Sequence, residues 1–595
     1  MIVPLMKVTT CGLVEDKERI LAELQEMGCL HLIALKPEEE TLTKGGPYPH
    51  SRDALRFLLS CPQRRRQVRD PSKFDALAVE HQALELRDKI QTLEDERDFL
   101  RGRIANLRPW GEFTFPPREE LNNLRLWFYV VPHNEMKKVE ETELVWEVIF
   151  WDNRFSYVVV ISENEPEGMP VERVRTGNKS LFELEERLEE VELELEDLQA
   201  ERASLTRWCD LFARNIHRLE DQEAVNEAAQ QTYDDSPVFA LQAWAPRENV
   251  EELRTYARDK GLALEVEDPQ LGETPPTLMH NPQLLASGQD LVSFYTMPKY
   301  WLWDPSIIVF LFFALFFAMI LADAGYSVTL GLILAALWKR MGHSDFGRRF
   351  RILMAALVGA GVTYGVLVGS YFGVAPAEGA LLSKLKMLDM MDFNVMMLLS
   401  VVVGLLHLVL ANAVTAWHGR RSIQAVVPAA WVFIFLGGFS VYLGSSGGET
   451  TAFLKTPGVV AMALGIAAVV FFTSVEGPLW RRLLRGLLGL TRLSNAFGDS
   501  LSYLRLFALG LASASLASTF NDLALRVKAG VPGIGLLFAL VIVILGHGLN
   551  FVLSLSSGVI HGLRLNFIEF FNWSISEEGH PFKTFARKEK GLWRT

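Results

Sequence analysis

FNVMMLLSVVVGLLHLVLANAVTA, at residues 393–416, is a stretch of 24 residues that contains no Asp, Glu, Lys or Arg. About 20 apolar residues in a helix span the hydrocarbon core of a bilayer. Similar apolar runs occur near 302–320, 324–338, 352–374, 424–443, 458–475, 497–525 and 533–571. These runs predict an all-α polytopic membrane domain of eight transmembrane helices over residues 301–595.

The final apolar run is longer than a bilayer requires. A helix over 533–571 would be about 58 Å long, against a hydrocarbon core of about 30 Å. We therefore expect the last two helices to be long and tilted.

The charge distribution divides the chain into two halves. The 595 residues carry a formal net charge of −12. Residues 1–290 hold 35 basic and 57 acidic residues, a net −22, and residues 291–595 hold 24 and 14, a net +10. With eight spans and a cytoplasmic N-terminus, 16 basic residues fall on the cytoplasmic side and five on the other, as the positive-inside rule expects. This predicts a multi-pass protein with both termini in the cytoplasm.

The same composition excludes several classes of protein. A wholly soluble enzyme and a compact all-membrane transporter are both inconsistent with the two halves. The basic residues of the second half lie in loops between apolar runs, so we expect no nucleic-acid binding. The four cysteines show no CxxC spacing, and the chain begins without a basic and apolar leader, so we expect a cytosolic N-terminal half without metal or cofactor.

Two helical stretches, 76–108 and 181–222, dominate the first half. Each repeats apolar residues at alternating spacings of three and four and is interrupted by one arginine, Arg97 or Arg202. The first series is Val79, Ala83, Leu86, Ile90, Leu93, Arg97, Leu100, Ile104 and Leu107, and the second is Leu184, Leu188, Val191, Leu195, Leu198, Arg202, Leu205, Cys209, Phe212, Ile216 and Leu219. This period of 3.5 residues predicts a long antiparallel coiled coil.

Strand-like runs flank these helices and predict small α/β lobes. They suggest lobes at about 1–75, 110–175 and 232–267, followed by a proline-rich linker over 268–300. The expected fold is an α+β cytoplasmic domain over residues 1–290, in which two small α/β lobes are joined by the coiled coil, followed by the membrane domain.

Arg505 lies within LSYLRLFALG, residues 501–510, with apolar residues on both sides. An arginine at bilayer depth costs about 2.5–3.5 kcal/mol on insertion scales, so it is a functional candidate. Residues at spacings of three and four beyond it, Ala508, Ala512, Ser515 and Thr519, are small and would allow another helix to approach closely. The alternative is an arginine paired with a carboxylate of its own bundle.

Arg564 has polar or small residues along its own helix face, His561, Ser557, Ser554, Asn550 and Gly546. Such a polar stripe is expected where water or ions enter the membrane, and the alternative is hydrogen bonding between packed helices. Glu569 could be the partner of Arg564 or could line a cytoplasmic vestibule. His547 lies beside the stripe and is expected to pack structurally.

Asp323 lies where the first two spans turn. We expect it to cap a helix and therefore to be structural.

Several of these segments resemble one known family. The stretches YLRLFALGL at 503–511 and HGLRLNFIE at 561–569 are similar to the two arginine motifs of the a subunit, called subunit I in prokaryotes, of V-type and archaeal-type rotary ATPases. Further similar segments are Met297 to Tyr300 with Asp304 to Ser306, Asp323 to Tyr326, and Gly365 to Gly373. The resemblance covers nearly the whole chain, and the length is that of the shorter prokaryotic forms.

The resemblance implies a stator subunit beside a rotating proteolipid c-ring in the cell (inner) membrane of a prokaryote. Arg505 would face the ring carboxylates and keep them ionised, and Arg564 would assist, because a fixed cation lowers the pKa of a nearby carboxylate. Half-channel candidates for H+ or Na+ are Asn495, Ser513, Asn550, Ser554, Ser557, His561 and Glu569. The N-terminal arm would hold peripheral stalk subunits, and ATP sites would lie on the ATP-hydrolysing sector that the central stalk connects, so the chain alone would not be an enzyme.

The sequence departs from the family pattern at two positions. Eukaryotic relatives tend to have a histidine eight residues after the first arginine and a glutamate ten before the second, where this chain has Ser513 and Ser554. The outer route therefore lacks two expected titratable groups. An alternative reading of the whole chain is an ion-coupled secondary transporter with a cytosolic regulatory domain, which would predict internal repeats.

Overall fold

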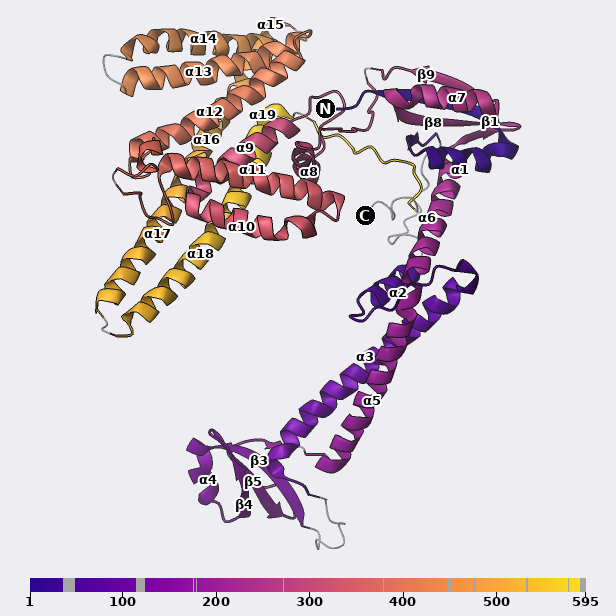
Figure 1. Cartoon of the computed structure of the whole chain (residues 1–595), viewed down its shortest axis with the longest axis vertical. Coiled ribbons are helices and arrows are strands. Elements are labelled where there is room, and N and C mark those ends of the chain that lie inside the picture. The colour runs from indigo at the N-terminus through magenta and orange to yellow at the C-terminus, as the bar shows by residue number, and fades with distance from the viewer. Residues whose placement is uncertain are drawn as a thin grey trace. The chain divides into compact units, whose positions relative to one another are not determined.

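The computed structural model describes the chain except for residues 36–48, 114–123, 175, 178, 271, 378, 447–450, 475–477, 531–532, 576 and 589–595. The chain forms two compact units (Figure 1). One consists mainly of Met1–Pro37 and Ala228–Ala586, and the other mainly of Glu38–Glu227.

The first unit contains a five-stranded antiparallel sheet built from both ends of the N-terminal half. Its strands are β1 (Leu5–Leu13), β2 (His31–Ile33), β7 (Tyr233–Asp235), β8 (Val238–Pro246) and β9 (Ala263–Glu267), in the order β2-β8-β1-β9 with β7 also paired to β8. In the register of β1 and β8, Leu5 lies opposite Pro246. Helices α1 (Lys17–Met27) and α7 (Val250–Lys260) accompany the sheet. The first part of the predicted range 1–75 and the range 232–267 thus contribute to one common lobe, whereas the rest of 1–75 belongs to the second unit.

The second unit is organised around two long helices, α3 (Ala76–Leu107) and α5 (Leu181–Leu205). The buried residues of α3 are Val79, Ala83, Leu86, Ile90, Leu100, Ile104 and Leu107, all members of the predicted seam. The predicted helix 181–222 is interrupted, because a short 3-10 turn at Thr206–Trp208 separates α5 from α6 (Cys209–Gln231). Helix α2 (Pro49–Leu59) packs near this interruption through Ala54 and Leu58. Supercoiling of the pair remains a prediction.

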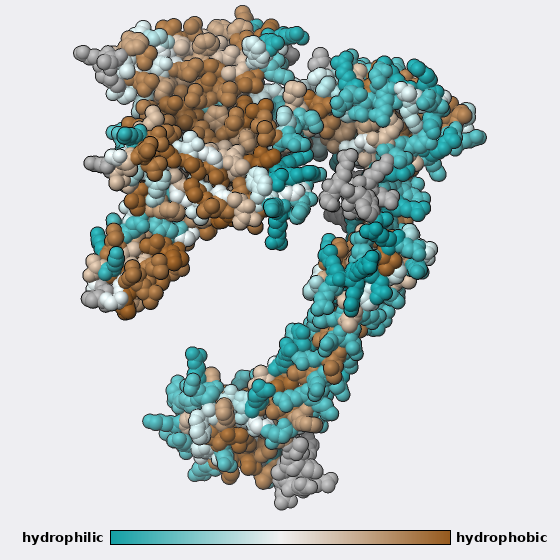
Figure 2. Space-filling model, viewed as in Figure 1, coloured by the Kyte–Doolittle hydropathy of each residue, from teal (hydrophilic) through white to brown (hydrophobic). Residues whose placement is uncertain are grey.

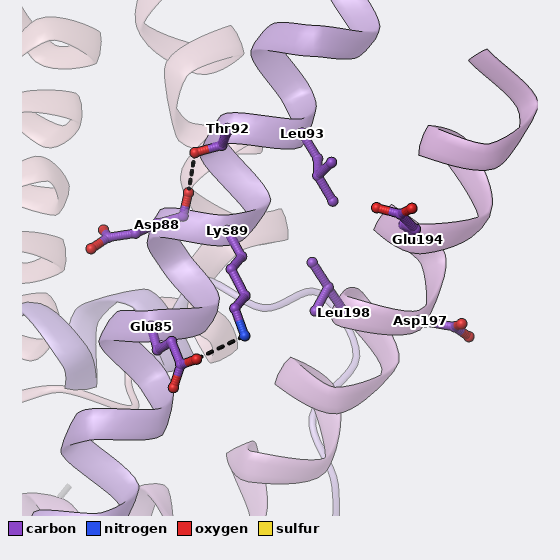
Figure 3. Close-up of a pocket in the computed structure, with 8 residues that line it drawn as sticks. All are labelled: Glu85, Asp88, Lys89, Thr92, Leu93, Glu194, Asp197 and Leu198. Atoms are coloured by element: carbon purple, nitrogen blue, oxygen red, sulfur yellow. Dashed lines mark hydrogen bonds and ion pairs between the residues drawn. The ribbon is translucent and has the colours of Figure 1, made fainter. Parts of the chain in front are cut away.

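The seam arginine Arg202 lies over the Phe57 ring of α2, 4.1 Å from its centroid, and donates a hydrogen bond to the Phe57 carbonyl oxygen at 2.6 Å. Figure 3 shows Leu93 and Leu198 pointing into a gap between α3 and α5. This groove has a volume of about 630 Å³, and four of its eight lining residues are acidic. The helix pair is therefore not uniformly closed along its length.

A second antiparallel sheet is inserted between α3 and α5. Its strands are β3 (Arg125–Pro132), β4 (Val145–Trp151), β5 (Phe155–Ser162) and β6 (Arg173–Val174), in the order β4-β5-β3-β6, and α4 (Met136–Glu140) follows β3. Val131, Val139, Val158 and Val160 are fully buried between α4 and the sheet.

The remaining helices belong to the apolar second half. They are α8 (Ala286–Tyr295), α9 (Ser306–Leu321), α10 (Ala324–Met341), α11 (Asp345–Val368), α12 (Phe393–His418), α13 (Val426–Ser446), α14 (Lys455–Phe472), α15 (Leu479–Gly489), α16 (Arg492–Ser502), α17 (Leu504–Gly530), α18 (Gly535–Arg564) and α19 (Phe571–Ser574). Figure 2 shows apolar residues over much of the visible surface of these helices.

Six helical segments of the described chain are long and apolar enough to cross a membrane. They are Asp345–Val368, Phe393–His418, Ile423–Ser446, Ala452–Phe472, Leu479–Gly530 and Gly535–Ser574, and the shorter apolar helix Ser306–Leu321 adds a seventh apolar segment. The last of the six is not one regular helix, because a π-helical segment at Leu565–Phe570 separates α18 from α19. The eight spans of the sequence analysis include α9 and α10, which fall short of this criterion, so the number eight remains a prediction.

The chain after α19 returns to the linker and to the N-terminal sheet. Isolated bridges join Pro298 to Glu578, Thr277 to Pro581 and Leu30 to Phe585. The segment 577–588 is called the C-terminal tail below. It connects the end of the membrane helices to the lobe that contains β2.

Candidate functional site

Arg505 lies in the first turn of α17, directly after a break between two helices. Helix α16 ends at Ser502, and Tyr503 separates it from α17. Tyr503 is fully buried, and its hydroxyl lies 3.0 Å from Nδ1 of His407 on α12. The His407 ring is stacked on Phe570, 4.4 Å between centroids. This packing fixes the backbone from which Arg505 projects.

The guanidinium of Arg505 forms no ion pair or hydrogen bond with any residue that the structure describes, and its Nη1 atom is buried without a partner. The small residues at spacings of three and four beyond it, Ala508, Ala512, Ser515 and Thr519, are all exposed. Arg505 therefore stands at one end of an open, nearly smooth helix face, as the spacing predicts.

The buried part of the polar stripe on α18 is hydrogen-bonded to α17. The hydroxyls of Ser513 and Ser554 lie 2.7 Å apart, and Asn550 Nδ2 donates to the Ser513 carbonyl oxygen at 2.9 Å. Ser554 Oγ donates to Asn550 Oδ1 at 3.4 Å. These three side chains are at most 7% exposed. At these positions the stripe joins packed helices, which is the alternative that the sequence leaves open.

Buried polar atoms without partners gather on the helices that carry the two arginines. They are Arg505 Nη1, His561 Nδ1, Asn566 Oδ1 and Glu569 Oε2. Arg564 and Glu569 both interact electrostatically with Arg505. Because buried polar atoms are nearly always hydrogen-bonded, this group is expected to be hydrated or to meet a polar partner from another chain.

Glu569 is 2% exposed and lies in the π-helical segment Leu565–Phe570. It forms no ion pair with Arg564 within the described chain, and the Arg564 side chain is exposed. Widening of the helix by one residue changes the face on which Glu569 lies, and π-helical turns are frequent at functional sites. Ser557 and His561 are partly buried on the preceding turns.

Asn495 lies away from the stripe, on α16. It is exposed and lines a small cavity with Arg492, Asn572 and Trp573. One turn further, Asp499 Oδ2 accepts a hydrogen bond from Trp573 Nε1 at 2.7 Å. Asp499 is a carboxylate near Arg505 in sequence that the sequence analysis did not single out.

Asp323 caps α10, as predicted. Its Oδ1 accepts the backbone N–H of Tyr326 at 3.0 Å, and the same carboxylate accepts Phe372 N–H, Gly373 N–H and the Ser370 hydroxyl. The four donors occupy both oxygens of a side chain that is 4% exposed. Asp323 is therefore a structural anion that holds residues 370–373 against the start of α10.

The sequence did not predict that Tyr326, Asn521 and His547 extend the hydrogen bonds of the polar stripe. The Tyr326 hydroxyl lies 2.7 Å from His547 Nδ1 and accepts from Asn550 Nδ2 at 3.0 Å. His547 Nε2 lies 2.9 Å from Asn521 Oδ1. The spacing of His547 three residues before Asn550 was the available signal, because it places both on one helix face.

Among the described residues, no group of three or more His, Cys, Asp or Glu side chains is arranged to hold a metal ion. The large groove between α3 and α5 contains none of the residues of the polar stripe.

No family model matches the chain. It is 27% identical to "V-type ATP synthase subunit I" of Chlamydia pneumoniae over 87% of each protein, and 24% identical to the protein of the same name from Borreliella burgdorferi over 99% of this chain and all of that protein. It is also 26% identical to "A-type ATP synthase subunit I" of Methanocaldococcus jannaschii over 67% of this chain and 63% of that protein.

One solved structure, the cytoplasmic N-terminal domain of subunit I, a homologue of subunit a of V-ATPase, is 18% identical and aligns with 44% of this chain and 99% of that domain, with a TM-score of 0.25.

Proposed function

The chain belongs to the subunit I family of V-type and A-type ATP synthases, and from this we propose that it is the stator a subunit of the membrane sector of such a complex. In this role it conducts H+ or Na+ through two half-channels beside a rotating proteolipid c-ring. It is not catalytic by itself, because the ATP sites belong to other subunits.

The observation that carries the proposal is the Arg505 guanidinium, which forms no ion pair or hydrogen bond with the described residues and adjoins an exposed face of small residues. A cation without such a partner in the described part of the chain is available to a carboxylate of a second, moving protein. The small side chains of Ala508, Ala512 and Ser515 let that protein pass closely. A nearby fixed cation favours the ionised carboxylate and so drives release of its ion before the next one binds.

The unsatisfied polar atoms around Arg505 support a hydrated region at this depth. We assign His561, Glu569 and Arg564 to it, with Ser557 on the turn before. Asn495 would lie on the cytoplasmic approach, near the cavity that it lines.

Asn550, Ser554 and Ser513 would border the outer half-channel. Their mutual hydrogen bonds must open, or water must pass beside them, for an ion to use this path.

The remaining parts of the proposal concern topology and partners. Eight spans, with α9 and α10 as the first two, would place both termini in the cytoplasm of a prokaryote and the protein in its inner membrane. The N-terminal lobe and the α3–α5 pair would hold peripheral stalk subunits against the torque of the rotor. The central stalk and the ATP-hydrolysing sector would complete the complex.

The decisive experiment is ATP-driven ion transport by the reconstituted complex with Arg505→Ala. We expect coupled transport to be lost, while the c-ring still co-purifies. Arg505→Lys should also fail, because lysine offers a shorter and more strongly hydrated point charge.

Arg526→Ala is the matched control, because Arg526 is an exposed arginine on the same helix α17. It should transport normally. Coupled transport by Arg505→Ala would contradict the proposed role of the arginine. A protein that purifies without a c-ring and transports ions alone would favour the secondary transporter, for which the relatives offer no support.

A further inference from the structure

The polar stripe of α18 continues beyond Asn550 as a series of hydrogen bonds. The series involves two further helices, α10 and α17, and one loop. Tyr326 comes from α10, His547 from α18, Asn521 from α17, and Phe372 from the loop held by Asp323. The links measure 3.0 Å from Asn550 to Tyr326, 2.7 Å from Tyr326 to His547, 2.9 Å from His547 to Asn521 and 2.8 Å from Asn521 to the Phe372 carbonyl.

The direction of each hydrogen bond in this chain is determined by the groups at its ends. Asn521 Nδ2 donates to the Phe372 carbonyl, so its Oδ1 is the acceptor for His547 Nε2–H. His547 Nδ1 is then an acceptor, and the Tyr326 hydroxyl must donate to it. The Tyr326 oxygen in turn accepts from Asn550 Nδ2. This series of hydrogen bonds is thus complete with a neutral imidazole whose ring lone pair, on Nδ1, accepts the hydrogen of the Tyr326 hydroxyl.

The charged surroundings of His547 are limited. Among the residues that the structure describes, Tyr326 is the only titratable side chain hydrogen-bonded to it. The rings of Tyr326 and Phe372 lie 5.9 Å from the imidazole. Asp323 is the charged group that acts on it electrostatically. Four hydrogen bonds hold that carboxylate in place.

We propose that His547 is a proton-transfer group of the outer half-channel, that Tyr326 connects it to the stripe, and that the transported ion is therefore H+. This rests on the proposed function. It also supplies a titratable group on the outer route. The family pattern leads one to expect two titratable groups there, but this chain has Ser513 and Ser554 at those positions.

The proton balance of the step is simple. A hydronium ion on the outer side gives one proton to His547 Nδ1, so that one O–H bond of the hydronium ion breaks, an N–H bond forms and a water molecule remains. This N–H then donates to the Tyr326 oxygen, and the tyrosine hydroxyl hydrogen turns away from the ring. When His547 later gives this proton to a water molecule of the stripe or of the outer side, the N–H bond breaks and an O–H bond of a hydronium ion forms. The neutral imidazole and its starting hydrogen bonds are then restored, with no change of oxidation state.

The chemistry of the hydrogen-bonded side chains around His547 favours H+ over Na+. A metal cation on a selective route is held by oxygen atoms that replace its hydration shell. Here the oxygens of Tyr326, Asn521 and Asn550 already accept hydrogen bonds from neighbouring side chains, and the imidazole of His547 lies in the middle of the hydrogen-bonded series. Imidazole is the side chain that exchanges protons most readily near neutral pH.

The test is the dependence of ATP-driven proton transport on luminal pH, with the complex in vesicles whose lumen faces the outer half-channel. In the wild type, the rate should fall as luminal pH falls, because a protonated His547 cannot pass on another proton. His547→Gln should transport about 100-fold more slowly, the lower end of the range for a positioned acid–base group. Its rate should no longer respond to luminal pH over that range, a change that a merely structural role would not produce.

Tyr326→Phe provides a second test that keeps the histidine. It should slow transport, whereas Tyr364→Phe, a buried tyrosine of α11 outside the hydrogen-bonded chain, should not. If His547→Gln does not assemble, a wild-type rate in Tyr326→Phe still overturns the inference. So does an unchanged pH profile in His547→Gln, and ATP-driven uptake of radioactive Na+ overturns the assignment of the ion.

These outcomes are separable from the proposed function. Loss of coupled transport in Arg505→Ala with an unaltered pH profile in His547→Gln rejects only the inference about His547. Coupled transport in Arg505→Ala rejects the proposed function whatever His547 does.

Discussion

Asp323 illustrates how one buried charge can organise a turn within the membrane half. It accepts hydrogen bonds from the start of α10 and from residues 370–373, which lie almost 50 residues further along the chain. Hydrogen bonds to charged groups contribute about 1.5–3 kcal/mol each, and donors left unpaired add a desolvation cost.

Asp323→Ala should therefore lower the free energy of unfolding by about 3 kcal/mol or more. Thermal denaturation of the purified protein in mild detergent measures this. Asp522→Ala, at an exposed position of α17, is the matched control and should have little effect. Equal denaturation temperatures of the two variants would show that the carboxylate does not stabilise the turn.

The candidate site was predictable to different degrees for different residues. Arg505 could be recognised from its apolar surroundings alone, because a charge at that depth is costly wherever its neighbours lie. The helix-capping role of Asp323 followed from its position before an apolar run. The link between Tyr326 and His547 could not be predicted, because these residues are 221 positions apart and meet only when α10 and α18 pack.

At the scale of elements, close helix packing positions the residues next to Arg505. Gly404 of α12 lies directly against Tyr503, since a Cβ atom added at Gly404 would come within 2.2 Å of the Tyr503 ring. A larger residue at 404 would displace the tyrosine and, with it, the start of α17.

Gly404→Ala should therefore lower the free energy of unfolding by about 1–3 kcal/mol, as overpacking does, and should reduce ATP-driven transport. Gly438→Ala on α13 is the control, because nothing lies within 4 Å of a Cβ atom added there. That variant should be neutral or more stable by up to about 1 kcal/mol, since alanine favours helix. A Gly404→Ala complex as stable and active as Gly438→Ala would refute the argument.

The elements also show where sequence patterns are informative. Seven of the nine predicted seam residues of α3 are buried, because a regular period depends on local spacing only. The breaks at Thr206–Trp208, at Tyr503 and at the π-helical segment were not predicted. Each depends on packing against another segment, such as Tyr503 against His407, and no local signal such as proline marks it.

At the scale of the whole molecule, the C-terminal tail connects distant parts of the first unit. The backbone N–H of Lys583 donates to His31 Nδ1 at 2.8 Å, and the ring of Phe582 lies 5.4 Å from that imidazole. Burial, and then the charge of the nearby His580, hold the pKa of His31 below its usual range. The docked tail therefore favours neutral His31.

Docking of the tail should weaken as pH falls below about 6.5, the usual pKa of histidine. The sign follows from the lowered pKa, because protonation of His31 removes the Nδ1 acceptor and is disfavoured when the tail is bound. Deuterium uptake by residues 577–585, corrected for the intrinsic pH dependence of exchange, should rise in that range.

His31→Asn keeps a polar side chain at this position without the titration, so its corrected uptake should not change with pH. A wild-type tail that is equally protected at acidic and neutral pH would contradict the role of His31.

The domain arrangement was only partly accessible from sequence. Composition separated the acidic half from the apolar half, because charge and hydropathy need no knowledge of contacts. The joining of β1 and β2 with β7, β8 and β9 in one sheet was not predicted, since pairing of β1 with β8 depends on contacts across more than 200 residues.

That pairing also determines the order in which the protein can fold. Strand β1 is made first, but its partner β8 begins 225 residues after β1 ends. At a synthesis rate of 5–20 residues per second, β1 waits roughly 10–45 s for a neighbour. During this time Leu5 and Val8, both buried in the finished lobe, have no sheet to cover them. A nascent chain that stops before residue 238 cannot complete the lobe, and the C-terminal tail can bind it only after every membrane helix has been synthesised.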